Sequence, residues 1–403
     1  MKICIVTAGL LPVPDVRGGA IERLMTLIAD VNEKNKRLEI TVLTQFNKNA
    51  VELQKKYRYT HFVNIKNWGG LYYKLAWKIR GALKRMLKKD FYDLHIYEHR
   101  VKKFLLKHGH EYDLIINEGL QYDVLEKVAK KYGRNKLCAH LHCNQFATEH
   151  FEKIYGSVIT VSDFIRKQYA ESSNLSERRM LTVFNGIDLE KIQIEMTPEE
   201  KKSLRKELGL KEDDFIMIFC GRLVAQKGIK ETISALSEMK EKKIKLLILG
   251  SSNFGLGDQG EFPRIIKKMI DENRDKIRFT GFVPNDQIYK YLSISDVGLV
   301  PSVYNDPCPL SMIEMIASGL PTIATRAGGL PEIGTKKTTI FIHIDSFQKD
   351  FIESVQMLYK DETLIRDMKK NAQSRSVFFD KDRFYCDFVK TLSFLEGERY
   401  VNN

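Results

Sequence analysis

Short runs of apolar, β-prone residues alternate along the chain with stretches in which apolar residues recur every three or four positions. The first run, KICIVTAG at 2–9, is followed by a loop with Arg17, Gly18 and Gly19, and then by a stretch with apolar residues at helical spacing from Leu24 to Val31. The next apolar run is ITVLTQF at 40–46. A strand, a helix and a second strand in this order predict the start of a parallel α/β sheet.

The same alternation continues through both halves. Further strands of the first half are predicted at DLIINEG (113–119), KLCAHLHC (136–143) and VITVS (158–162). Strands of the second half are predicted at FIMIFCGRL (215–223), IKLLILG (244–250), IRFTGF (277–282), VGLVPS (297–302) and PTIATRAGG (321–329). Helices between them are predicted at GIKETISALSEM (228–239), PRIIKKMIDEN (263–273) and LSMIEMIAS (310–318).

This pattern predicts two doubly wound parallel-sheet α/β domains in tandem, residues 1–185 and 186–375. Apolar periodicity stops between them, at FNGIDLEKIQIEMTPEE (184–200), and 403 residues exceed what one core normally holds. The last segment, 376–403, has aromatic residues at helical spacing and no strand partner, so we expect it to pack back on the first domain.

The composition fits a globular protein of a reducing compartment. Hydrophobic residues make up 43% and charged residues 29%. No apolar run reaches the ~18 residues of a membrane-spanning helix, and the N-terminal residues do not form a secretory signal. The six cysteines are scattered and form no CxxC pair. We therefore expect a cytoplasmic protein.

The net charge of +13 lies entirely in residues 1–185, which carry 32 Lys and Arg against 19 Asp and Glu. Such an excess suits a polyanionic partner, nucleic acid or an acidic membrane surface, or else a basic surface kept for solubility. Twelve of these basic residues fall in 66–107 with three acidic ones, among apolar residues at helical spacing. That segment predicts a basic amphipathic helix on an anionic membrane, with a helix packed on its own sheet as the alternative.

Two cations follow the first strand of the second half. Arg222 closes that strand and Lys227 stands five residues later, before a helix. Ligands of doubly wound sheets bind at the carboxyl ends of strands, and two cations there suit a diphosphate that gains negative charge as a bond breaks. The alternative is an ordinary surface pair, and in either case we expect both side chains to be exposed.

Two carboxylates accompany a predicted helix start in the second half. Asp306 precedes the helix and Glu314 follows eight residues later, on the helix. A helix N-terminus can bind a phosphate, whereas the two carboxylates suit hydroxyls of an attached sugar or ribose. Gly328 and Gly329, after the next strand, let backbone approach a ligand closely. A capping Asp and a surface Glu remain the alternative.

Histidines and cysteines cluster in CAHLHCN at 138–144. His140 and His142 alternate on one face of a predicted strand, beside Cys138 and Cys143. Four ligands within six residues of a strand cannot easily close a tetrahedral zinc site, so we expect no metal here. A buried histidine pair without a ligand remains an alternative.

Several of these segments together resemble the retaining glycosyltransferases of family 4, of the bacterial cell-envelope and capsular polysaccharide type. The matching segments, in the family's order, are RGGAIERL (17–24), VSDFIR (161–166), FNGID (184–188), CGRLVAQKG (220–228) and DPCPLSMIEMIASGLP with AGGLPEI (306–333). The resemblance implies the GT-B architecture, two Rossmann-like domains facing across a cleft. It also implies an acceptor-binding first domain and a donor-binding second domain.

The resemblance implies roles on the donor side. Arg222 and Lys227 match the pair that grips the donor diphosphate, and Glu314 matches the second Glu of the family's Glu-x7-Glu motif, which contacts the ribose. Asp306 stands where the first Glu contacts sugar hydroxyls, and it is one methylene shorter. The family's usual Phe-Gly is Cys308-Pro309 here.

Further roles follow from the same resemblance. Because Pro309 lacks a backbone donor, the phosphate contacts shift to Leu310 and Ser311. Gly18 and Gly19 match the flexible loop that faces the donor.

On the acceptor side, His142 is the best match to the family's histidine near the donor sugar, and His140 is the fallback. Glu118 and Asn144 are placed on the same side.

The resulting hypothesis is transfer of a sugar, with retention, from a nucleotide diphosphate sugar to a hydroxyl of a lipid-linked or cell-envelope saccharide. UDP is the expected nucleotide. We expect no cofactor, no metal and no nucleic-acid partner, and a location in the cytoplasm at the inner face of the membrane. Two alternatives remain: a nucleotide-sugar isomerase or hydrolase of the same fold, and a catalytically weak glycosyltransferase partner subunit.

Overall fold

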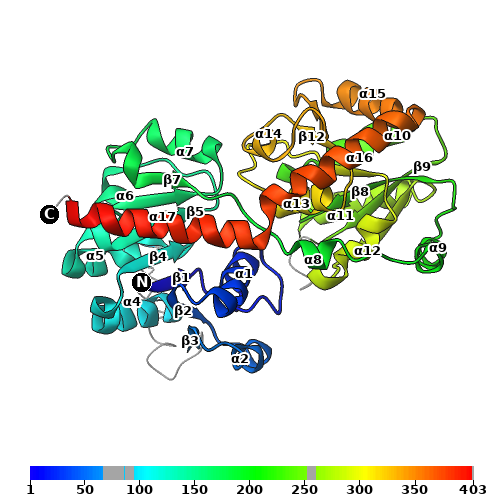
Figure 1. Cartoon of the computed structure of the whole chain (residues 1–403). Coiled ribbons are helices and arrows are strands. Elements are labelled where there is room, and N and C mark those ends of the chain that lie inside the picture. The colour runs from blue at the N-terminus through cyan, green and yellow to red at the C-terminus, as the bar shows by residue number, and fades with distance from the viewer. Residues whose placement is uncertain (67–85, 87–94, 252–259, 402–403) are drawn as a thin grey trace. The chain divides into compact units, whose positions relative to one another are not determined.

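The chain divides into two compact units, each built of a parallel sheet with helices on both faces (Figure 1). Unit 1 comprises Met1–Asn185 and Lys381–Asn403, and unit 2 comprises Gly186–Asp380. The computed structural model describes residues 1–66, 86, 95–251 and 260–401. No helix within these ranges is long and apolar enough to span a membrane.

Within the described residues of unit 1, seven strands pair in parallel in the order β3-β2-β1-β4-β5-β6-β7. The strands are β1 (Lys2–Thr7), β2 (Glu39–Gln45), β3 (Thr60–Ile65), β4 (Leu114–Glu118), β5 (Leu137–Leu141), β6 (Ser157–Thr160) and β7 (Met180–Thr182). The central strands β1, β4 and β5 are buried almost throughout, as expected for strands covered on both faces.

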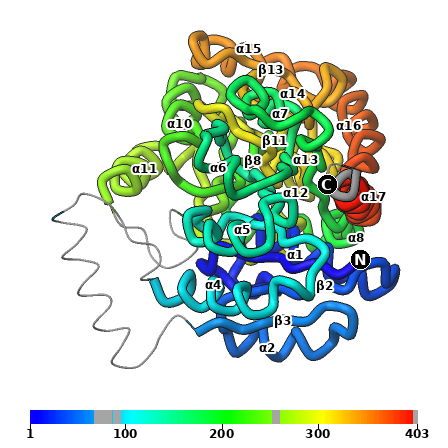
Figure 2. The backbone as a smooth tube through the Cα atoms, turned by 90° about the vertical axis from the view of Figure 1, so that its left-hand side faces the viewer, coloured from blue at the N-terminus to red at the C-terminus, as the bar shows by residue number. Residues whose placement is uncertain are grey.

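Helices cover both faces of this sheet. They are α1 (Ala20–Asn35), α2 (Lys48–Gln54), α4 (Ile96–His108), α5 (Glu126–Tyr132), α6 (Glu149–Ile154), α7 (Asp163–Ala170) and α17 (Lys381–Val401). Helices α4 to α7 share one apolar core with the sheet. The C-terminal helix α17 packs against α1, where Tyr385 Oη donates to Asn32 Oδ1 at 2.5 Å (Figures 1 and 2).

The basic segment 66–107 is described only at Lys66, Met86 and residues 95–107. In its described part, α4 buries Tyr97, Val101 and Leu105 in the core of unit 1, as a helix packed on its own sheet does. The remainder of the segment, on which the predicted membrane helix depends, lies outside the described residues.

Unit 2, over its described residues, forms a six-stranded parallel sheet in the order β10-β9-β8-β11-β12-β13. The strands are β8 (Phe215–Cys220), β9 (Ile244–Leu249), β10 (Ile277–Gly281), β11 (Val297–Val300), β12 (Thr322–Thr325) and β13 (Thr339–Ile342). The helices are α8 (Leu189–Ile192), α9 (Pro198–Glu207), α10 (Ile229–Glu238), α11 (Glu261–Glu272), α12 (Ile288–Ser293), α13 (Leu310–Ala317), α14 (Leu330–Ile333), α15 (Phe347–Lys360) and α16 (Glu362–Ser376).

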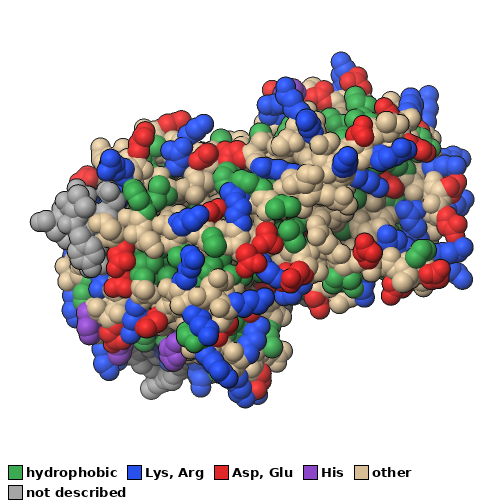
Figure 3. Space-filling view, in the orientation of Figure 1, with side chains coloured by type: hydrophobic (Ala, Val, Ile, Leu, Met, Phe, Trp, Pro, Cys, Tyr) green, Lys and Arg blue, Asp and Glu red, His purple; other side chains and the backbone are tan. Residues whose placement is uncertain are grey.

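The core of unit 2 lies between this sheet and the helices α10, α11 and α15, whose apolar residues pack on the strands. Helices α13 and α16 pack against each other, and α13 also contacts β11. On the face of unit 2 visible in Figure 3, basic and acidic side chains are interspersed, in line with the balanced charge of the second half of the chain.

These two parallel sheets confirm the predicted fold class. Three strands were not predicted from the sequence: β3, β7 and β13. Each lies at the edge of its sheet and is only partly buried.

Candidate functional site

The loops after β8, β11 and β12 in unit 2 are held together by close backbone contacts. Strand order reverses between β8 and β11, the position where ligands bind in open α/β sheets. Gly228 has a positive φ of 69°, and a Cβ there would collide with the carbonyl oxygen of Pro301. Gly329 N–H donates to the Asp306 carbonyl at 2.8 Å, and a Cβ on Gly328 would strike the Asp306 backbone. The loops therefore fix the position of Asp306.

Lys227 and Asp306 form an ion pair in this loop cluster. Lys227 Nζ lies 2.5 Å from Asp306 Oδ2, which also accepts a 2.9 Å hydrogen bond from Ser302 Oγ. The side chains of Lys227 and Asp306 are only 18% and 4% exposed, whereas Arg222 is exposed. The prediction of an exposed side chain is thus correct for Arg222 and wrong for Lys227. The Lys227 ammonium pairs with Asp306 and lies over the ring of Tyr304.

Helix α13 begins beside this pair. Its N-cap residue is Pro309 and no side chain caps it, so the amides of its first turn, on Leu310 and Ser311, are available to an anion. Glu314, one turn further along, is 3% exposed and is therefore not a surface residue. The structure also rules out Asp306 as the helix cap. The predicted donor-side residues of unit 2 thus lie around one edge of its sheet.

The glycine loop of unit 1 leads into α1. Gly18 and Gly19 both have positive φ, and Gly19 is the N-cap residue of α1. A Cβ on Gly19 would collide with the carboxylate of Glu22, which is buried. The pKa of Glu22 is raised to about 7, chiefly by burial; a hydrogen bond from its own backbone N–H lowers the pKa, and the charges of Asp15 and Glu118 raise it by smaller amounts. Glu22 was not predicted from the sequence, although it lies within the RGGAIERL motif.

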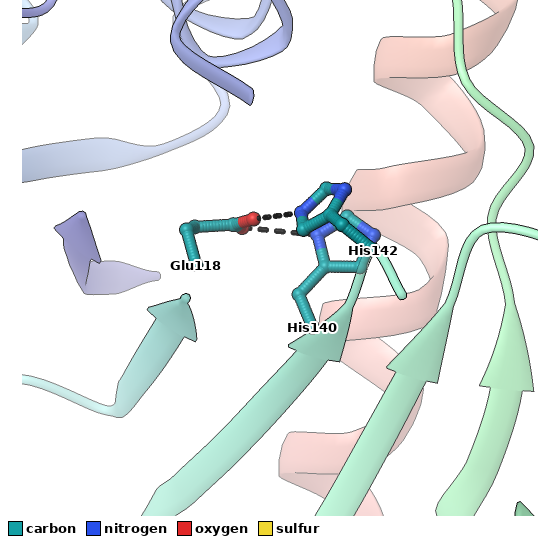
Figure 4. A group of neighbouring side chains, drawn as sticks. All are labelled: Glu118, His140 and His142. Atoms are coloured by element: carbon teal, nitrogen blue, oxygen red, sulfur yellow. Dashed lines mark hydrogen bonds and ion pairs between the residues drawn. The ribbon is translucent and has the colours of Figure 1, made fainter. Parts of the chain in front are cut away.

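Glu118, His140 and His142 meet at the carboxyl ends of β4 and β5 (Figure 4). The strands pair with Asn117 opposite Ala139, which brings Glu118 level with His140. Glu118 Oε1 lies 3.0 Å from His140 Nδ1, and Oε2 lies 2.6 Å from His142 Nε2. Glu118 and His140 are fully buried as side chains, and His142 is 12% exposed. Two histidines placed on one face by the sequence thus share one buried carboxylate.

Electrostatics in this group favour an ionised Glu118. Burial by itself raises the pKa of Glu118, but interaction with His140 and the hydrogen bond from His142 outweigh burial and lower that pKa to about 2. Burial lowers the pKa of His142, as does neighbouring His140, and Glu118 opposes both effects. Glu118 is therefore an ionised hydrogen-bond acceptor, and its partner His142 tends to stay neutral.

Among the described residues, these three form the group whose donor atoms lie close enough together to hold a metal ion. Neither Cys138 nor Cys143 belongs to it. The separations of 2.6 and 3.0 Å are hydrogen-bond lengths, shorter than the roughly 3.3 Å between ligands of a tetrahedral zinc ion. The geometry is that of a hydrogen-bonded group. Asn144, also predicted for this side, is half-buried in the loop that follows His142.

Known proteins match unit 2 by itself and also the chain over both units. Residues 200–375, within unit 2, match the family described as "Glycosyl transferases group 1". An uncharacterised glycosyltransferase of Methanocaldococcus jannaschii is 33% identical over 177 residues, which are 44% of either chain. Spore coat protein SA of Bacillus subtilis is 26% identical over 396 residues, 93% of this chain and 95% of that protein. The crystal structure of Anabaena HepE in complex with UDP-glucose matches with a TM-score of 0.73 at 19% identity, over 98% of this chain and 99% of that one.

Proposed function

We propose that the protein transfers a sugar from a nucleotide diphosphate sugar to a hydroxyl of a saccharide acceptor. The premise is a group 1 glycosyltransferase with the GT-B fold, which these comparisons support. One observation carries the proposal: Arg222, Lys227 and the uncapped start of α13 all belong to the ligand-binding edge of one sheet. Unit 2 then binds the donor, and unit 1 binds the acceptor.

The donor diphosphate is assigned to Arg222, Lys227 and the amides of Leu310 and Ser311. Two cations offset the negative charge that develops on the leaving diphosphate. Asp306 Oδ2 already accepts bonds from Lys227 and Ser302, which leaves Oδ1 for a hydroxyl of the donor sugar.

The nucleotide side of the donor is assigned to Glu314, which accepts a hydrogen bond from the ribose. UDP is the proposed nucleotide, supported by the UDP-glucose complex of HepE. Gly18 and Gly19 supply close-approaching backbone on the side of unit 1.

Transfer is proposed to retain configuration at the anomeric carbon and to need no divalent metal and no cofactor. The acceptor attacks on the face that the diphosphate leaves, and a donor phosphate oxygen takes the acceptor proton. Arg222 and Lys227 supply the positive charge that a metal ion would otherwise bring. His142, with His140, Glu118 and Asn144 around it, contacts sugar hydroxyls from unit 1.

The proposed acceptor is a saccharide of the cell envelope, carried on a lipid at the inner face of the membrane. Its support is the charge distribution, because the whole excess of basic residues lies in residues 1–185. An anionic membrane surface would attract that excess.

The test is a thermal-shift series with UDP, ADP, GDP and UDP-glucose. A ligand present at 100 times its Kd stabilises the native state by about 2.7 kcal/mol, so UDP should raise Tm in the wild type and fail to do so in Arg222→Ala. Arg274→Ala, at an exposed arginine that pairs with Asp271, is the matched control and should respond like the wild type.

Release of UDP then separates the alternatives. Release that requires an added saccharide identifies a transferase, and release to water alone identifies a hydrolase. Conversion of the nucleotide sugar to an isomer without net UDP release would identify an isomerase, and UDP binding with neither release nor conversion would point to a partner subunit. Absence of any nucleotide-dependent shift would refute the proposal.

A further inference from the structure

We infer that Glu118 is a positioning residue that holds His142 in a single tautomer, with the proton on Nε2, so that Nδ1 accepts a hydrogen bond from a sugar hydroxyl. The inference rests on the proposed function for the identity of that hydroxyl. The tautomer itself follows from unit 1 alone.

The hydrogen bond fixes where the proton lies. Glu118 Oε2 is 2.6 Å from His142 Nε2, and an ionised carboxylate can only accept, so Nε2 must donate. In a neutral imidazole the other nitrogen, Nδ1, is then an acceptor. Among the described residues, the hydrogen bond of the His142 ring is made by Nε2, and Nδ1 is not one of the buried polar atoms that lack a partner. The side chain is 12% exposed. Nδ1 is therefore the nitrogen that a ligand can reach.

His140 prevents Glu118 from turning away. Its Nδ1 donates to the second carboxylate oxygen, Oε1, at 3.0 Å, so both oxygens of Glu118 are held. The His140 ring is fully buried, 4.3 Å from the His142 ring centroid and 6.3 Å from that of Phe388 on α17. Its Nε2 is buried without a partner. The same burial makes His140 unsuitable as the fallback histidine, because no hydroxyl reaches it.

This arrangement makes the function of His142 depend on pH. The titratable groups that act on the site are His140 from β5, Glu118 from β4 and, through Glu118, Glu22 from α1. Protonation of Nδ1 removes the acceptor. Because the pKa of His142 lies below its ordinary 6.5, the neutral form predominates at neutral pH, and activity should fall only in more acidic solution.

The tautomer can be observed by long-range ¹H–¹⁵N correlation on the full chain labelled with ¹⁵N-histidine, with His142→Gln to assign the signals. The expected wild-type spectrum shows His142 protonated on Nε2. In Glu118→Gln the glutamine oxygen can accept a hydrogen bond from one histidine ring, while its NH₂ group donates to the other ring. His142 should then populate both tautomers. A wild-type His142 protonated on Nδ1, or an even mixture, would overturn the inference.

A second experiment measures the rate of UDP release from UDP-glucose as a function of pH. Glu118→Gln should lower kcat by about 10- to 100-fold, as losses of orienting partners do. It should also move the acid limb to lower pH, because loss of the negative charge lowers the pKa of His142 further. Glu111→Gln removes the carboxylate of an exposed His108 pair, 2.7 Å apart in the same unit, and should change neither quantity.

The remaining outcomes discriminate among explanations. If Glu118→Gln lowers activity but leaves the acid limb of the pH profile unchanged, Glu118 has only a structural role, and the inference that it positions His142 is refuted. Stoichiometric Zn²⁺ binding that Glu118→Gln abolishes would replace the hydrogen-bonded group by a metal site. A wild type that neither binds UDP nor releases it would defeat the proposed function, while the tautomer spectrum would still decide whether Glu118 positions His142.

Discussion

Replacing Lys227 by alanine should lower both stability and turnover, whereas replacing Arg222 by alanine should lower turnover alone. Both cations are assigned to the same diphosphate, but their surroundings differ. Lys227 is paired at 2.5 Å with Asp306, whose side chain is only 4% exposed, whereas Arg222 is exposed. The contrast separates a structural contribution of Lys227 from its contribution to catalysis.

The magnitude follows from the state of Asp306 once its partner is gone. Removing one member of a buried ion pair costs roughly 3–5 kcal/mol, because an uncompensated charge stays buried. Lys227 is 18% exposed, which favours the lower end, about 3 kcal/mol. For a unit the size of unit 2 this corresponds to a fall in Tm of about 6–12 °C. Arg222→Ala should stay within about 0.5 kcal/mol of the wild type.

Calorimetry of the full chain and UDP release from UDP-glucose give the two readouts. Each variant should lose about 100-fold or more in kcat, as for loss of one preorganised transition-state donor. The double variant Lys227→Ala/Asp306→Ala should regain part of the lost Tm, because it leaves no unpaired carboxylate. Lys243→Ala is the matched control, since Lys243 pairs with Asp213 at 2.7 Å on the surface of the same unit.

Equal Tm values for Lys227→Ala and Arg222→Ala, with no recovery in the double variant, would show that the ion pair does not contribute to stability. Near-wild-type turnover of either variant would instead refute the diphosphate assignment.

Three further predictions test other parts of the proposal. Activity should persist in excess EDTA, because Arg222 and Lys227 take the place of a divalent ion; loss in chelator with recovery in Mn²⁺ or Mg²⁺ would contradict this. The protein should sediment with anionic liposomes at low salt and dissociate at 1 M salt, where the screening length falls to about 3 Å. Substitution of the basic residues at 84, 85, 88 and 89 by Gln should weaken this attachment, and equal binding to neutral vesicles would argue against it. The contribution of Glu22 to stability should fall as the pH rises from 5 to 8, because the pKa of Glu22 is about 7 in the folded chain against an ordinary value of 4.5, a difference of roughly 3 kcal/mol. Glu22→Gln should abolish that dependence in urea unfolding at the two pH values, and an unchanged pH dependence would show that Glu22 ionises normally.

The sequence by itself determined the parallel α/β class, because buried central strands such as β1, β4 and β8 are apolar over most of their length. Their alternation with helices then leaves few topologies. Three of the four edge strands of the described sheets, β3, β7 and β13, escaped prediction; each has one neighbour and is only partly buried. An edge strand lacks the continuous apolar run that marks a central one.

The sequence also identified most members of the candidate site, because their order relative to predicted strands places them at carboxyl ends. Arg222, Lys227 and Asp306 follow strands that prove to be neighbours, and Glu118 and His140 lie at the carboxyl ends of two neighbouring strands. For parallel strands, position along the chain relative to the strand end is enough to predict which edge of the sheet a residue joins.

Only the tertiary structure decided which of these side chains interact. Lys227 and Asp306 are separated by 79 positions, and Glu118 and His142 by 24, so no local spacing encodes either contact. The burial that shifts the pKa of Glu22 likewise comes from the folded surroundings of α1. Strand periodicity is a local property of the chain, whereas the pairing of charges and the desolvation that tunes them exist only once distant segments have packed together.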